Sequence, residues 1–245
     1  MIICTLLQIY VTVVQHLTKK FHISFLLLIT LFISCNSSKE DSIQLKGFLN
    51  KMIPKNEKFA KIEFDKYDSY LIKDIEKQLE IDLCDNGNFI AVSNVKGIDI
   101  KFPAFALKKC DDFIPIHGVV NIEINSNNET LIDHKFVPPE SNIENEVLKA
   151  TNQWMVNKYR KRLLYLITWD SLAQPSFVNN KINETLFAVK KYYDSIAISS
   201  FKKNLNKLEM LEVKTLRDKF DFKIGFKGYK LPTPPPPPPK SKDIE

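Results

Sequence analysis

The chain has 245 residues, of which 44% are hydrophobic and 26% are charged, and its formal net charge at pH 7 is +6. The length is sufficient for one sizeable domain or two small ones. The positive excess is mild and is carried almost wholly by scattered lysines, with arginines only at Arg160, Arg162 and Arg217, so nucleic-acid binding is not expected.

Near the start of the chain, an apolar run lies between two lysines and a cysteine. Lys19 and Lys20 precede the run Phe25 to Ile33, which is too short to span a bilayer, and Ser34 then precedes Cys35. This pattern resembles the export signal and lipobox of bacterial lipoproteins. The resemblance implies that residues 1–34 are an export signal and that Cys35 carries palmitate-type acyl chains.

The alternative interpretation of this segment is an uncleaved anchor or a buried apolar segment. The change to polar residues at 36–41 disfavours it, because such a stretch is typical of a tether leaving a membrane surface. A second apolar stretch, Ile2 to Val14, lies ahead of the lysines, whereas export signals usually begin with the charged segment. We therefore expect translation to start near Leu17.

Three charged residues follow the cysteine closely and bear on localisation. Lys39, Glu40 and Asp41 resemble the Lys-plus-two-acids signal that sends some lipoproteins of Bacteroidetes-type bacteria to the cell surface. The alternative is a hydrophilic tether whose charges only keep the linker solvated. The prediction is an outer-membrane lipoprotein on either the periplasmic face or the cell surface.

The chain after the cysteine divides into a tether over 35–56, an α+β body over 57–230 and a tail over 231–245. Subregions of the body are expected at 57–112, 113–170 and 171–230. Hydrophobic patterning in the first subregion predicts a strand at 60–64, a helix at 67–79, a hairpin of 81–84 and 89–92 around Asn86-Gly87, and a strand at 98–102.

The second subregion predicts the order strand, strand, helix, strand, at 118–124, 131–137, 143–154 and 163–169. Matching positions are Gly118, Val120, Ile122, Ile124, Ile132, Val137, Ala150, Trp154 and Leu166. With a lead-in beginning at Phe102-Pro103, residues 102–170 resemble the C-terminal domain of TonB-type proteins. That resemblance implies a module that binds the periplasmic face of outer-membrane transporters.

The third subregion predicts two helices within 183–220, broken near Ser199-Ser200, and a last strand at 222–226. Six prolines, Pro234 to Pro239, follow. Such a run adopts polyproline II and cannot enter a packed core, so it is either a solvated tail or an arm that docks in an aromatic groove.

Two cysteines remain once Cys4 and Cys35 are set aside. Cys84 and Cys110 would lie in an oxidising compartment, where such a pair most often forms a disulfide. Zinc held with His117 and His134 and a pair of buried thiols are the alternatives, although the ligand spacing is not typical of a zinc site. No cofactor or metal is predicted.

Candidate catalytic groups after Cys35 are few. His117 and His134 lie outside any recognisable motif, and the neighbouring carboxylates Asp111 and Asp112 are typical of a solvated turn. The predicted fold class is α+β, with small mixed or antiparallel sheets packed with amphipathic helices. The predicted function is a lipid-anchored envelope protein that binds a protein or peptide. The alternative is an envelope hydrolase with an unrecognised site.

Overall fold

The computed structural model describes residues 40–53, 57–62, 64, 68–84, 87–95, 97–106, 118–157 and 162–229. The chain divides into two compact units, Met1–Gln44 and Leu45–Glu245. In the first unit, the described residues 40–44 are helical, and Gln44 donates a side-chain hydrogen bond to Glu40 one turn earlier at 3.4 Å. All remaining described residues belong to the second unit.

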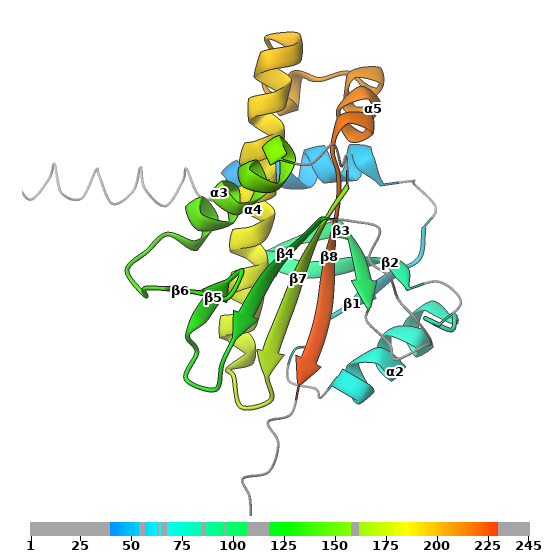
Figure 1. Ribbon diagram of the computed structural model, residues 1–245. Coiled ribbons are helices and arrows are strands. Elements are labelled where there is room, and N and C mark those ends of the chain that lie inside the picture. Colours follow the sequence, from blue (N-terminus) through cyan, green and yellow to red (C-terminus); the bar gives the residue numbers. More distant parts are fainter. Residues whose placement is uncertain are drawn as a thin grey trace, which may run out of the picture. The chain divides into compact units, whose positions relative to one another are not determined.

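The second unit is built on one eight-stranded sheet with the order β1-β2-β3-β8-β7-β4-β5-β6 (Figure 1). Its strands are β1 (Phe59–Lys61), β2 (Asn88–Val95), β3 (Ile98–Ala106), β4 (Gly118–Ile124), β5 (Thr130–Ile132), β6 (Lys135–Val137), β7 (Arg162–Asp170) and β8 (Asp221–Tyr229). The predicted α+β class is therefore confirmed, and the strands of all three predicted subregions join in a single mixed sheet.

The centre of the sheet is parallel and its flanks are antiparallel. Strands β3, β8, β7 and β4 run parallel, whereas β2 pairs antiparallel with β3, and β5 pairs antiparallel with both β4 and β6. Strand β1 lies at one end of the sheet and pairs parallel with β2. Parallel neighbours need long crossovers, so helices connect the central strands.

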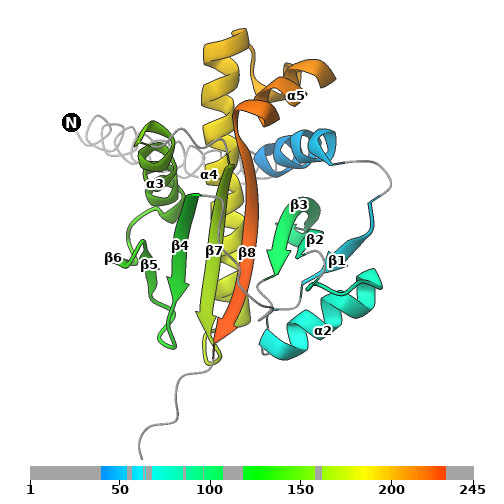
Figure 2. The same ribbon diagram turned by 45° about the vertical axis from the view of Figure 1, so that its right-hand side comes forward.

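Helix α3 (Ile143–Asn157) precedes β7, and α4 (Pro175–Phe201), η1 (Leu205–Lys207) and α5 (Met210–Lys219) connect β7 with β8. Both α3 and α4 cover the same face of the sheet, and Figure 2 shows α4 running behind β7 and β8. From α3, Thr151 Oγ1 lies 2.8 Å from Tyr165 Oη of β7. From α4, the Tyr193 ring packs 6.1 Å from Phe222 of β8.

Alternate residues of the central strands form the core on this face. Ile122, Ile167 and Phe226 are in register across β4, β7 and β8, and each has at most 2% of its surface exposed. Tyr193 is fully buried and donates a hydrogen bond from its hydroxyl to the Phe220 carbonyl at 2.6 Å. Burial raises the pKa values of Tyr165 and Tyr193 well above that of an exposed tyrosine, because the phenolate would lose its hydration.

Helix α2 (Asp68–Leu79) lies beside β1 in both views (Figures 1 and 2). Its buried residues Leu71, Ile75 and Leu79 recur at helical spacing and join the core. The predicted helix at 67–79 therefore forms with almost its expected bounds. No described helix is both long enough and apolar enough to cross a bilayer.

The predicted tether needs correction, because its described residues 40–44 in the first unit and 45–52 in the second unit are helical. Within the second unit, Leu45, Phe48, Leu49 and Met52 of that helix are buried, and the Phe48 ring lies 4.9 Å from the Tyr193 ring. Their spacing is that of an amphipathic helix, whereas the prediction for 35–56 is a tether.

The predicted hairpin around Asn86-Gly87 is wrong, because Ile81 to Cys84 is not a strand. Local side-chain bonds hold this segment instead: the Leu83 amide donates to Glu76 Oε1 at 3.0 Å, and the Cys84 amide donates to Asp82 Oδ1 at 2.8 Å. Strand β2 pairs with β3 across eight residues. The turn between them includes Gly97, whose φ of 81° suits glycine.

Two further boundaries differ from the prediction. The strand expected at 131–137 is divided into β5 and β6 by Asp133 and His134, whose positive φ values of 48° and 64° make a tight turn. Helix α4 begins at Pro175, eight residues before the predicted start, with the proline in its first turn. The helices break at Lys202, which has a left-handed φ of 56°.

Candidate functional site

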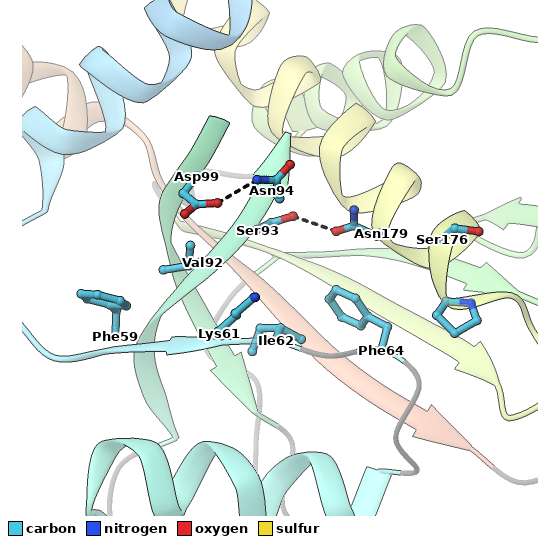
Figure 3. Close-up of a pocket in the computed structure, with 11 residues that line it drawn as sticks. Phe59, Lys61, Ile62, Phe64, Val92, Ser93, Asn94, Asp99, Ser176 and Asn179 are labelled. Carbon is cyan, nitrogen blue, oxygen red and sulfur yellow. Dashed lines mark hydrogen bonds between the residues drawn. The ribbon is translucent and has the colours of Figure 1, made fainter. Parts of the chain in front are cut away.

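A pocket of about 500 Å³ opens at the β1 end of the sheet. Figure 3 shows residues from β1, the segment after it, β2, β3 and the first turns of α4 around this space. Its lining residues are Phe59, Lys61, Ile62, Phe64, Val92, Ser93, Asn94, Asp99, Pro175, Ser176 and Asn179. We call this space the β2-edge pocket.

The pocket exists because β1 is shorter than its neighbour. The three residues of β1 pair with Ile90, Ala91 and Val92, whereas β2 continues to Val95. Among the described strands, none pairs with Ser93–Val95 on the β1 side. An unpaired strand edge presents backbone N–H and C=O groups, and these groups can accept a further strand.

The outer edge of β1 itself is closed by α2. The Gln78 carboxamide accepts a hydrogen bond from the Lys61 amide at 2.8 Å and donates one to the Lys61 carbonyl at 3.1 Å. These two bonds occupy the Lys61 backbone groups, with which an added strand would otherwise pair. The side chain therefore blocks strand addition at β1 and leaves the continuation of β2 as the open edge.

Polar side chains of the pocket wall are held by one another. The Ser93 hydroxyl lies 2.8 Å from Asn179 Oδ1 and 3.2 Å from Asn183 Oδ1, which ties β2 to α4. Asn94 donates from Nδ2 to Asp99 Oδ1 at 2.8 Å and accepts the Gly97 amide at 3.0 Å. These bonds fix the β2–β3 turn relative to α4 and give the pocket a preformed wall.

Apolar surface occupies both ends of the pocket floor. Phe59 is 48% exposed at one end, and the Lys101 ammonium lies 3.8 Å from its ring centroid. Phe64, at the other end, is buried against Trp169 and Phe226 with ring centroids 5.6 and 5.8 Å away. The floor therefore combines one accessible aromatic ring with one ring anchored in the core.

The chemistry of this pocket suits binding better than catalysis. The Ser93 hydroxyl and the carboxamides of Asn94 and Asn179 are engaged in the wall, and the lining contains one lysine and one carboxylate but no histidine. Within the described ranges, no three side chains of His, Cys, Asp or Glu come together as metal ligands. An apolar floor beside an open strand edge fits an extended polypeptide.

Most residues named from the sequence lie away from this pocket or outside the described residues. Cys35, Lys39, Cys110, His117, Asp111 and Asp112 lie outside the described residues. Glu40 and Asp41 are among the described helical residues of the first unit. His134 lies in the β5–β6 turn, where its Nδ1 is 2.7 Å from Glu123 Oε1, and so it has no part in the β2-edge pocket.

Of the two cysteines in the predicted disulfide, only Cys84 is among the described residues. Cys84 is disulfide-bonded and follows the helical turn at the end of α2. Its predicted partner Cys110 lies outside the described residues, so the Cys84–Cys110 pairing stays a prediction. Because Cys84 is disulfide-bonded, its sulfur is neither a thiolate ligand nor a free thiol, so the alternative zinc site and the alternative pair of buried thiols do not fit this cysteine.

The β2-edge pocket could not be predicted from the sequence. Strand alternation correctly placed Ala60 and Ile62 inward and Lys61 outward, but it carried no information on where β1 would end relative to β2. The remaining signal was Phe59, an aromatic residue on the solvent side of the pattern.

No protein-family model, curated protein or solved structure matches the chain.

Proposed function

We propose that this protein is a lipid-anchored component of the bacterial cell envelope whose body binds a protein or peptide. The bound segment adds a strand to β2 at Ser93–Val95 and places its side chains in the β2-edge pocket. The observation that carries the proposal is the difference in length between β1 and β2, which leaves a strand edge open beside an apolar floor.

Support for the anchor comes from the sequence alone. Lysines, a short apolar run and a small residue precede Cys35, and a cysteine bearing several acyl chains remains stably bound to a bilayer. We therefore propose an outer-membrane lipoprotein. Lys39, Glu40 and Asp41 decide between the periplasmic face and the cell surface.

The TonB-like resemblance remains part of the proposal in a restricted form. Residues 118–170 contain β4, β5, β6, α3 and β7, so strands and a helix follow one another in the expected order. Strand β7 is paired with β4 on one side and β8 on the other, so no edge of β7 can accept a partner strand. We accordingly place strand addition at β2.

Site-specific photo-crosslinking in cells tests where the partner binds. A benzophenone amino acid replaces Phe59 in one variant and Phe136 in another. The two phenylalanines are 48% and 55% exposed, and Phe136 lies on β6 at the opposite end of the sheet, so it is a matched control. We expect position 59 to form an adduct whose partner segment can be mapped by mass spectrometry.

A peptide made from the mapped segment then tests strand addition directly. Methylation of its alternate backbone amides removes hydrogen-bond donors and keeps every side chain. We expect the methylated peptide to bind at least about tenfold more weakly in fluorescence anisotropy, because strand addition depends on backbone hydrogen bonds. Equal affinity of the two peptides would exclude strand addition.

The anchor is tested independently of the partner. Cys35→Ala should abolish incorporation of labelled palmitate and leave an unprocessed or soluble species. Protease shaving of intact cells then compares the native protein with a variant in which Lys39, Glu40 and Asp41 are all replaced by alanine. Digestion of the native form alone indicates the cell surface, and protection of both forms indicates the periplasm.

A further inference from the structure

Strand β8, which precedes the proline-rich segment in the sequence, passes close to the β2-edge pocket. The pocket residue Phe64 packs 5.8 Å from Phe226, measured between ring centroids, and Phe226 precedes the last residue of β8, Tyr229, by three residues. Three residues of strand cover about 10 Å. Tyr229, the last described residue before the proline-rich segment, therefore lies within reach of the Phe64 end of the pocket.

The lengths of the two segments match. Phe59 and Phe64 are five residues apart, so an extended chain between them covers at most about 18 Å. Six consecutive prolines in polyproline II cover about 19 Å. Residues 230–233 can bridge from the end of β8 to the pocket, which leaves the run Pro234 to Pro239 to follow its floor.

The chemistry of the two segments is also complementary. Polyproline II segments bind grooves that present aromatic rings, because their conformation is already fixed and little entropy is lost on binding. Phe59 offers such a ring, and Pro175 widens the apolar surface at the first turn of α4. Beyond the prolines, Asp243 and Glu245 would reach the end of the floor where Lys61 and Lys101 lie.

We propose that Pro234 to Pro239 occupy the β2-edge pocket of their own chain and compete with the partner segment. The inference uses the site of the proposed function but requires neither the lipid anchor nor an identified partner. Proline lacks a backbone N–H, so the docked segment covers the open edge of β2 without forming a strand ladder on it. Covalent attachment makes its effective concentration about millimolar, so weak docking suffices to protect the edge.

Intramolecular crosslinking of the purified full chain tests this docking without any partner. The benzophenone amino acid replaces Phe59, with the same replacement at Phe136 as the matched control. Trypsin cleavage after Lys230 and Lys240 releases the segment from Leu231 to Lys240 as one peptide. We expect an adduct of this peptide in the monomer from position 59 and none from position 136.

A tail variant of the full chain provides the second measurement. Replacement of Pro234 to Pro239 by alternating glycine and serine keeps the length and removes polyproline II. We expect this variant to lose the crosslink from position 59. The peptide identified with the native protein should bind it about three to ten times more tightly, because the pocket is no longer occupied.

Three outcomes would overturn the inference: an adduct elsewhere in the chain, an adduct found only in crosslinked dimers, or unchanged crosslinking of the glycine–serine variant. Failure of the proposed function leaves a different pattern. In that case position 59 captures the tail in the purified protein, but no partner segment maps to the same position in cells.

Discussion

The centre of the sheet and its β1–β2 end differ in how completely the edges of their strands are paired with neighbouring strands. In the centre, β7 is paired with β4 along seven residues and with β8 along nine, and helices cover the aromatic face. At the β1–β2 end, a three-residue strand covers part of a longer one and a pocket forms where it stops. Strands paired on both edges stabilise the fold, whereas an unpaired strand edge can form backbone hydrogen bonds with another chain.

The largest contrast between the two regions is expected from deletion of an aromatic ring. Phe222 is 1% exposed among Tyr165, Tyr193 and Phe220, so Phe222→Ala should lower the free energy of unfolding by about 3–5 kcal/mol through lost packing and a cavity. Phe59→Ala, at the pocket, should cost less than about 1 kcal/mol, because the ring is half exposed. Urea unfolding of both variants measures the difference; equal losses would contradict it.

The predicted disulfide concerns the β1–β2 end of the sheet. If Cys84 is joined to Cys110, reduction should lower the free energy of unfolding by about 3 kcal/mol, because the unfolded chain loses a crosslink. Alkylation without reductant, followed by peptide mapping, identifies the partner. Alkylation of Cys110 in freshly isolated native protein would refute this pairing.

Alkaline pH should act on the centre. Tyr165 and Tyr193 have raised pKa values in the folded state because they are buried, so above pH 10 the unfolded state loses these protons while the folded state keeps them. Each tyrosine should then lower the free energy of unfolding by about 1.4 kcal/mol per pH unit. The stabilisation is complete below pH 10 and declines as the pH rises.

Single substitutions provide the control for this pH dependence. Tyr193→Phe should reduce the slope above pH 10 by about half, because one of the two buried phenols is removed. The matched control is Tyr70→Phe, which removes the same hydroxyl from a tyrosine on α2 that is 63% exposed. Chemical unfolding between pH 9 and 11 measures both; a slope independent of Tyr193 would contradict the assignment.

The smallest expected effect concerns the closed edge of β1. Gln78→Ala removes both hydrogen bonds to Lys61 and should lower the free energy of unfolding by only about 0.5–1.5 kcal/mol. The more easily measured consequence of Gln78→Ala should be concentration-dependent self-association, because the Lys61 backbone groups at the edge of β1 lose their partner and can pair with another chain. Sedimentation velocity measures it, with the exposed neighbour changed in Lys77→Ala as control; a monomeric Gln78 variant would show that α2 protects this edge by bulk alone.

Local patterns were sufficient to predict most of the elements. Alternation in Gly118–Ile124 and helical spacing in 68–79 gave bounds close to those observed, because each element buries one face of its own sequence. The same reasoning gave the α+β class. It did not identify the helical residues of 40–52, because the buried apolar residues Leu45, Phe48, Leu49 and Met52 lie within the predicted tether.

The sequence by itself determined the α+β class and most of the helices and strands, because these depend on residues that are neighbours in the chain. For the same reason it carries the signals for the predicted lipidation at Cys35 and for the proline-rich segment. The tertiary structure alone decided the sheet order, the pairing of β2 with β3 instead of 81–84, and the position of the β2-edge pocket. Strand register and strand ends are set by contacts between residues distant in sequence, such as Lys61 with Gln78 and Ser93 with Asn179. These contacts cannot be predicted from a local sequence pattern, and the candidate site depends on them.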